Sequence, residues 1–560
     1  MPGRLLNIRR TAGALSIITA ALLTASPAYA LSGGDEVTGK TQPFLAQIQI
    51  GNPGDTNARS CSGALVAPQW VVTAASCFGG TAANGYQVTT GSPAAQATLP
   101  GKLGVAITRV VSHGDRDVAL ARLAYKMTSV APATLGSTAP TTGDSVSASG
   151  YGRTATDWVP NLPRSSAFSA AVDSDTTLSL AGAQDTCKGD AGGPVLRATA
   201  TGTELIGVNS TSWQHGCLGE TTTRQGSEEA RTDNISDWIR YQVDPVNSWA
   251  FLPGSGPFFP HSKTVTSRAA TGVGHSASLT GQHATDIVGR RISDNALVAY
   301  QNNGNTTVDD HSLKAGVVIG TGWDVYTMFQ QTDINGDGVS DVIARGTDGT
   351  LYAYLGTGKL NGTSTFNSRF IVGRGWNTYD SVFAADTNGD GKAELFGVKT
   401  DDVDPTQLSM WGYTNTGTVN GTSTWQPGVK VATGEKEVVP SGFADFTGDG
   451  KADLFLETNY ANGVNDLAVL DQYANGVDTS GAPKQPVTYR VGSGWTPQQL
   501  LTIGDINGDG HPDLIGTATD GTLNSYVHTG TFVRDSGHGA GTFGAPILTG
   551  RAWNVFDIIT

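Results

Sequence analysis

The sequence predicts an all-β protein built from at least two domains. The chain has 560 residues, which is more than one hydrophobic core usually serves. Gly contributes 74 residues, about twice the roughly 7% usage of average proteins. Charged residues make up only 15% of the chain, against about 25% on average. Short β-rich runs recur between clusters of Gly, Pro, Ser and Thr, so we expect turn-rich β structure with few helices.

Residues 1–30 have the pattern of a secretory signal peptide. Three Arg residues precede the apolar run "AGALSIITAALL", and the small-residue sequence "AYA" ends the segment at Ala30. A membrane anchor needs about 20 apolar residues, and Ser, Thr and Pro interrupt this run. We therefore expect a secreted, extracellular protein without a membrane span in its mature chain.

Charge and cysteine content narrow the function classes further. The formal charge is −14, and removal of Arg4, Arg9 and Arg10 with the leader makes it −17, so a basic surface for nucleic acid is not expected. Four cysteines in an exported chain indicate two disulfides with three possible connectivities. We expect sequence neighbours to pair, and these are Cys61 with Cys77 and Cys187 with Cys217.

The domain boundaries follow changes in composition. Residues 31–243 hold β-rich runs such as "WVVTAA" and end in a predicted helix, "RTDNISDWIRYQV". Residues 244–272 are rich in Pro and Gly and lack periodicity, which indicates a linker. From residue 273 to 560 one template recurs, with first aspartates at Asp333, Asp386, Asp445 and Asp505. A repeat of 53 to 60 residues predicts a repeat domain.

Each repeat contains an acidic loop suited to a hard cation. Oxygens at loop positions 1, 3, 5 and 9, with a backbone carbonyl at position 7, converge on one point, as Ca²⁺ requires. An EF-hand would need Glu at position 12 and flanking helices, but position 12 is Ala344, Gly397, Leu456 or Gly516, and a β-rich run follows. We expect about four Ca²⁺ ions. The candidate ligands are Asp333, Asn335, Asp337, Val339, Asp341; Asp386, Asn388, Asp390, Lys392, Glu394; Asp445, Thr447, Asp449, Lys451, Asp453; and Asp505, Asn507, Asp509, His511, Asp513.

This second half resembles FG-GAP repeats, and the acidic loop is the most specific part of the resemblance. The resemblance implies a β-propeller of four-stranded blades with calcium in their loops. A weaker copy at residue 278, "SLTGQHATDIVGR", lacks most of the acids, so we count five blades, the first without a metal. The terminal "GRAWNVFDIIT" repeats the start of a blade and is expected to close the ring against blade one.

The first half resembles the chymotrypsin-like and trypsin-like serine peptidases. "CSGALVAPQWVVTAASC" at 61–77, "DVALARL" at 117–123 and "DTCKGDAGGP" at 185–194 occur in the order of that family's base, acid and nucleophile regions. The resemblance implies two packed β-barrels with a cleft between them. It places the nucleophile position at Ala191, the base position at Ser76 and the orienting acid at Asp117.

Two of these three groups cannot perform the family's chemistry. A methyl group cannot attack a carbonyl, and a serine hydroxyl is not a base near neutral pH. Removal of the nucleophile or the base of such a triad costs about 10⁶-fold in turnover. Rescue would need another base, and His113 is the nearest in sequence to Asp117. The sequence therefore predicts a catalytically inactive peptidase homologue.

Other family features remain. The amides of Gly189 and Ala191 are expected to form an oxyanion site, since backbone donors do not depend on the missing hydroxyl. Asp190 matches the acid that pairs with a freed amino terminus, which is Leu31 after cleavage at Ala30; the alternative is that Asp190 only caps its turn. Asp185 matches the acid that gives a Lys or Arg preference, although Thr211 stands where an aromatic residue is usual.

Three hypotheses for function follow. The first is an inactive peptidase homologue that acts as a calcium-stabilised binding protein for a protein, peptide or glycan ligand outside the cell. The second is an active serine endopeptidase with a Lys or Arg preference. The third is an adhesion or lectin-like propeller protein in which the first domain is a spacer.

Overall fold

The structure of the chain is a computed structural model that divides into two compact units, Met1–Asp237 and Trp238–Thr560. The division falls inside α1 (Ser236–Val243). The predicted leader and residues 260–272 of the predicted linker lie outside the described residues. Those described are residues 31, 34–52, 58–79, 86–87, 94–158, 162–252, 255–259, 278–282, 284–458, 465–475, 486–496, 499–534 and 541–560.

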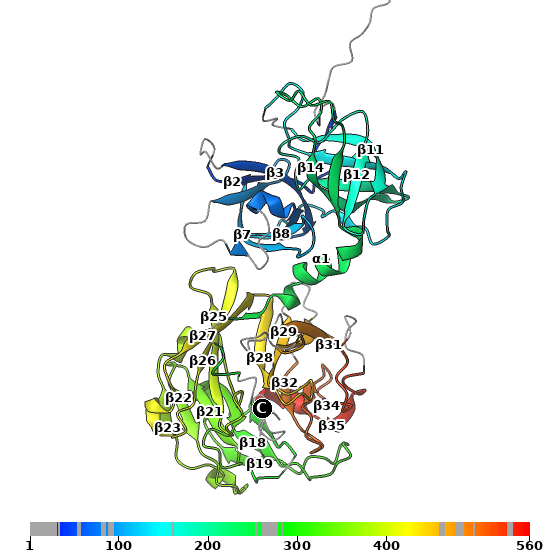
Figure 1. The fold of residues 1–560 in the computed structure, drawn as a ribbon. Helices are drawn as coiled ribbons and strands as arrows, with labels where there is room; N and C mark the ends of the chain where they lie inside the picture. The colour runs from blue at the N-terminus through cyan, green and yellow to red at the C-terminus, as the bar shows by residue number, and fades with distance from the viewer. Residues whose placement is uncertain are drawn as a thin grey trace, which may run out of the picture. The chain divides into compact units, whose positions relative to one another are not determined.

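The first unit contains two closed six-stranded β-barrels, as expected (Figure 1). The alternating sequence of β2 (Leu45–Ile50) turns Ile48 and Ile50 inward, where they are buried. The barrel closes because β6 pairs with both β2 and β7. Around the first barrel the strands are β2, β3 (Arg59–Ala67), β4 (Trp70–Thr73), β8 (Ala119–Leu123), β7 (Val105–Ser112) and β6 (Ala95–Thr98).

The second barrel follows the same closed plan, and its core lies between β10, β11, β12, β13 and β14. Val146, Leu178 and Val195 are among its buried core residues. The order is β10 (Ser145–Gly150), β13 (Pro194–Thr199), β14 (Gly202–Ser212), β15 (Ser227–Arg231), β12 (Thr177–Ala181) and β11 (Arg164–Val172), which pairs again with β10.

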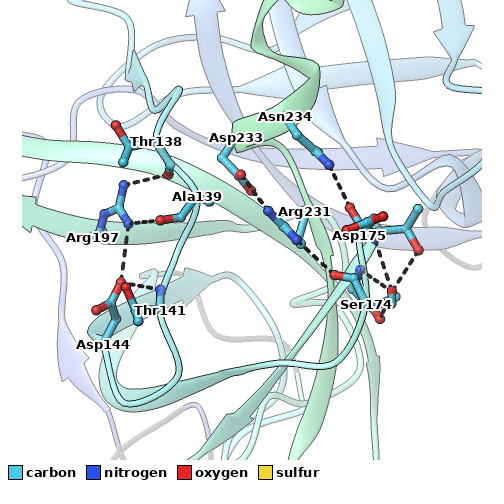
Figure 2. A network of polar contacts seen from close by, with 12 residues as sticks. Thr138, Ala139, Thr141, Asp144, Ser174, Asp175, Arg197, Arg231, Asp233 and Asn234 are labelled. Carbon is cyan, nitrogen blue, oxygen red and sulfur yellow. Dashed lines mark hydrogen bonds and ion pairs between the residues drawn. The ribbon is translucent and has the colours of Figure 1, made fainter.

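Two arginines fasten the loops of the second barrel (Figure 2). Arg197 donates to the carbonyl oxygens of Thr138 and Ala139 and to the Asp144 carboxylate. Arg231 makes a two-pronged pair with Asp233, at 3.0 and 2.8 Å, and donates to the Ser174 carbonyl. These bonds hold the loops through charge-assisted contacts, which are stronger than neutral hydrogen bonds.

The second unit is a propeller-like ring of five blades, each an antiparallel sheet (Figure 1). Three blades have four consecutive strands in order, and a fourth gains an extra outer strand, β16 (Ala250–Phe251). These blades are β20 (Tyr326–Thr332), β21 (Asp341–Gly346), β22 (Leu351–Tyr354), β23 (Phe370–Gly373); β24 (Ser381–Ala385), β25 (Glu394–Thr400), β26 (Gln407–Tyr413), β27 (Val429–Glu435); β28 (Val438–Ala444), β29 (Asp453–Thr458), β30 (Asn465–Asp471), β31 (Val487–Trp495); and β32 (Leu501–Gly504), β33 (Asp513–Thr517), β34 (Leu523–Tyr526), β35 (Ile547–Gly550).

The last strand closes the ring on the first blade, which confirms the expectation from the terminal repeat. β36 (Phe556–Ile559) pairs antiparallel with β17 (Ile287–Arg291), with Gly289 opposite Ile559. β18 (Leu297–Tyr300) and β19 (Val317–Gly320) complete this blade. Because sequence-distant strands share one sheet, neither end of the ring is left as an open edge.

Part of the segment predicted as a linker is packed into the propeller unit. β16 pairs with β27, and Trp249 is 2% exposed with its indole N–H donating to the Val438 carbonyl over 2.8 Å. Phe258 and Phe259 join the same core cluster. The sequence did not predict this packing, because the three buried aromatic residues are not regularly spaced and lie among Pro and Gly.

In the part of the chain that the structure describes, no helix is long and apolar enough to span a membrane.

Candidate functional site

The base and acid positions of the cleft are brought together by the first barrel. Ser76 lies in a short 3₁₀ turn (Ala75–Phe78) just after β4, and Asp117 lies just before β8, which pairs with β4. The Ser76 amide donates to Asp117 Oδ1 over 2.7 Å, and its hydroxyl donates to Oδ2 over 2.9 Å. Ser210 from β14 donates to the same Oδ2 over 2.7 Å. The Asp117 carboxylate therefore accepts hydrogen bonds from two hydroxyls and an amide. The resemblance had implied a histidine imidazole at the position of Ser76.

His113 does not replace that imidazole. Its Nδ1 lies 2.7 Å from Asp115 Oδ1, and its backbone amide donates to the Val118 carbonyl. The ring is thus directed to the neighbouring acid of its own loop rather than to Asp117.

The nucleophile turn keeps its shape around a methyl group. Gly189 has φ of 101°, a backbone conformation that favours glycine. The Ser62 hydroxyl donates to the Gly189 carbonyl over 2.8 Å, and the Ser62 amide donates to the Ala191 carbonyl over 2.9 Å. Within the described residues, the amides of Gly189 and Ala191 donate no hydrogen bond, so two N–H donors are left for a ligand oxygen.

Both disulfides flank this cleft with the expected pairing. Cys61 is joined to Cys77 next to Ser76, and Cys187 is joined to Cys217 at the nucleophile turn. The connectivity predicted from sequence proximity is confirmed.

Asp190 is buried beneath the turn. Its Oδ1 accepts from the Gly152 amide over 2.7 Å and its Oδ2 from the Cys187 amide over 2.8 Å. Burial raises the pKa of Asp190 to about 7, although these two amides favour its charged form. Leu31 is also buried, and its carbonyl accepts from the Gly34 amide. The chain places no cation against Asp190 among the described residues, and an amino terminus freed at Leu31 stays a prediction.

Asp185, the predicted specificity residue, is buried, with 2% of its surface exposed. Its Oδ2 accepts from the His215 amide over 3.1 Å and its Oδ1 from the Gly226 amide over 2.9 Å. Sequence reasoning missed the stack beside this acid, where the Arg224 guanidinium lies 3.5 Å from the centre of the Trp213 ring. Trp213 thus places an aromatic side chain two positions after Thr211.

A second buried acid, Glu229 on β15, was also missed. It is fully buried, and its Oε2 accepts from the Ser210 amide over 3.2 Å. Burial raises its pKa to about 8, with the charge of Asp190 adding to the shift. In the sequence Glu229 is an acid within a β-rich run, and strand propensity does not tell a buried acid from an exposed one. Its burial follows from the pairing of β15 with β12 and β14.

The four acidic loops lie between strands, as expected, and each joins the first two strands of its blade. In the first loop, Asp333 accepts from the amides of Gly336 and Gly338, while Asp341 accepts from Ile334 and Gly356. The position-5 acids are exposed and the position-9 acids are buried in all four loops. The position-9 residue thus anchors the loop to the blade, and Asp286 makes the same two amide contacts in the blade expected to lack metal.

A calcium ion in these loops would need carboxylate oxygens together with amide or hydroxyl oxygens and a backbone carbonyl. Within the described residues, no group of three or more His, Cys, Asp or Glu side chains lies close enough to hold a metal ion. A cation in these loops therefore also needs the oxygens of positions 3 and 7, as the predicted ligand sets do. The third loop contains two buried oxygens without a hydrogen-bond partner, Asp453 Oδ1 and Thr447 Oγ1, and both belong to its predicted set.

The two barrels, the glycine turn and the Asp117 cluster define the class of this first unit as a trypsin-like serine peptidase homologue. Residues 31–239 match the Trypsin family, and residues 333–397 match the FG-GAP-like repeat family. The chain therefore combines a trypsin domain with an FG-GAP-like repeat region, as the sequence predicted.

Two curated relatives agree with the first assignment. A protein named Trypsin from Simulium vittatum is 29% identical over 215 residues, which are 33% of this chain and 83% of that protein. Trypsin-2 from Salmo salar is 28% identical over 210 residues, which are 33% of this chain and 84% of that protein.

Proposed function

We propose that this chain is a secreted, catalytically inactive peptidase homologue that acts as a calcium-stabilised binding protein for protein or glycan ligands. The observation that carries the proposal is the arrangement of Ser76, Asp117 and Ala191. Asp117 is saturated by hydroxyl and amide donors, and the nucleophile turn presents a methyl group. The serine-peptidase mechanism needs a nucleophile and a base that takes its proton, and neither Ala191 nor Ser76 supplies such a group.

The retained parts of the cleft support binding. Gly189 and Ala191 offer amides to a carbonyl oxygen, and Asp185 offers a buried charge to a cationic side chain. Asp185 stands at the position that the resemblance links to a Lys or Arg preference, which supports a peptide with Lys or Arg as the ligand of this cleft. The unmet oxygens of Asp453 and Thr447 support calcium in the propeller loops.

Secretion is supported by the leader pattern of residues 1–30 and by the two disulfides, which form in oxidising compartments. It also follows that extracellular calcium would be available to the loops.

A fluorophosphonate probe tests the inactivity directly. We expect no labelling of the mature protein at a reagent concentration that labels trypsin completely, because the probe needs an activated serine. Labelling at a trypsin-like rate, mapped to a peptide of this chain by mass spectrometry, would favour the active endopeptidase instead.

A further inference from the structure

The five blades surround a cavity of about 210 Å³. Every blade contributes residues from its inner strands, so the cavity lies on the axis of the ring. Its lining includes Gln330 from β20, Phe383 from β24, Thr502 from β32 and Ile559 from β36. β28 and β29 add Ser441 and Glu457, and Glu457 is the single charged side chain of the lining.

The repeat position of Glu457 differs between blades, and Val398 and Thr517 occupy it in two of them. Four residues after the position-9 acid, two other blades carry Arg290 and Arg345. Arg290 donates to the Trp323 and Tyr326 carbonyls, and Arg345 donates to the Tyr379 carbonyl, which ties each blade to the next. A carboxylate cannot donate such bonds, so Glu457 does not make this blade-to-blade contact.

The Glu457 carboxylate is left with a free oxygen. Its Oε1 accepts from the Ser441 hydroxyl over 2.6 Å, and no other hydrogen bond or ion pair of this carboxylate occurs among the described residues. Burial raises the pKa of Glu457, because the charged form is poorly solvated there. A bound cation would restore the missing stabilisation of the charge.

We propose that this axial cavity binds a small alkylammonium ion, with Glu457 as its counter-ion. The alkyl part of such a ligand fits against Met328, Phe455 and Leu501, and aromatic rings favour cations near them. A divalent metal ion would need about six oxygen ligands. Two side-chain oxygens of the lining are already engaged, because Gln330 Oε1 accepts from the Ala384 amide and Thr560 Oγ1 accepts from the Gln331 amide. The site stands independently of the peptidase-like cleft and of the proposed function.

Calorimetric titration of the mature full-length protein at saturating calcium tests the site with n-butylammonium and n-butanol. We expect saturable binding of n-butylammonium and none of n-butanol, because only the cation pairs with Glu457. Glu457→Gln should weaken binding at least about tenfold, which corresponds to about 1.4 kcal/mol. Asp324→Asn, which removes an exposed carboxylate outside the cavity, should bind as the unaltered protein does.

Glu457→Gln is expected to fold, since it removes a poorly solvated charge while an amide oxygen can still accept from Ser441. An unchanged circular dichroism spectrum and melting temperature without ligand check this point. Equal affinity of Glu457→Gln for n-butylammonium, equal binding of n-butanol, or no binding by the unaltered protein would each overturn the proposal.

Discussion

The Ser76 hydroxyl donates to Asp117 Oδ2 over 2.9 Å, and the Ser76 amide donates to Asp117 Oδ1 over 2.7 Å. Both oxygens of Asp117, at the predicted acid position, are thus engaged by Ser76, at the predicted base position. The Ser210 hydroxyl shares the same Oδ2, so the cluster is a satisfied hydrogen-bond network around one charge. Three predictions concern this first unit, and a fourth concerns the propeller loops.

Restoring both lost groups should restore hydrolysis. Ser76→His with Ala191→Ser is expected to cleave an arginyl fluorogenic peptide, because Asp117 and the glycine turn are already placed to hold the two side chains. Each single variant should stay near the background rate, since triad members act as a unit and each loss costs about 10⁶-fold. Rates of peptide cleavage and probe labelling measure the effect. A single variant as fast as the double variant would contradict the unit argument.

Benzamidine should bind the first unit through Asp185. The amidinium would pair with a buried acid that accepts from two backbone amides, so binding should raise the melting temperature of the mature protein. Asp185→Asn should lose this shift, while Asp35→Asn, at an exposed acid on β1 (Asp35–Glu36), should keep it. Absence of any shift in the unaltered protein would instead favour the spacer hypothesis.

Glu229 should make the first unit less stable as the pH rises. Its pKa is raised from 4.5 to about 8 by burial, so the protonated form stabilises the fold below about pH 4.5 and this contribution is lost as pH rises through 8. The free energy of unfolding should fall by about 1.4 kcal/mol for each pH unit within this window. Glu229→Gln should remove that part of the slope in urea unfolding at pH 5 and pH 8.

The neighbouring exposed acid supplies the control for this measurement. Glu228→Gln should leave the pH slope as it is, because this side chain is exposed to solvent in the folded chain, unlike the buried Glu229. An identical slope in Glu229→Gln and the unaltered protein would show that Glu229 is not the titrating group.

Removal of calcium should lower the melting temperature of the propeller unit, because the loops concentrate like charges that the cation offsets. Asp449→Asn keeps an oxygen that can accept from the Lys451 amide but removes one charge from the third loop. The variant should bind one Ca²⁺ fewer by calorimetry, with Asp324→Asn unchanged. A melting temperature that chelation does not affect would contradict calcium binding.

The local features of this chain were predictable from sequence because they depend on neighbours along the chain. The loops recur with Gly at position 6, which has φ of 79° at Gly338 and permits the sharp turn. The losses at Ser76 and Ala191 are visible as residue types in a recognisable order. The disulfide pairing followed from proximity alone, and the terminal repeat identified the strand that closes the ring.

Other features depend on contacts between distant segments and could not be predicted. Trp249 was assigned to a linker segment, although its indole is buried against Val438, 189 positions later. Glu229 was an ordinary acid in sequence until burial between strands isolated its charge.

The sequence by itself therefore determined the two-part organisation, the repeats and the residue types at Ser76 and Ala191, because each depends on residue identity and spacing. Only the tertiary structure decided what surrounds those residues. The Ser76 and Ser210 hydroxyls both donate to Asp117, and Arg224 stacks on Trp213. Glu457 lies on the ring axis with one carboxylate oxygen that accepts no hydrogen bond from the described residues. The physical reason is that solvation and partner geometry are set by segments far apart in the chain, which meet only when the strands pair.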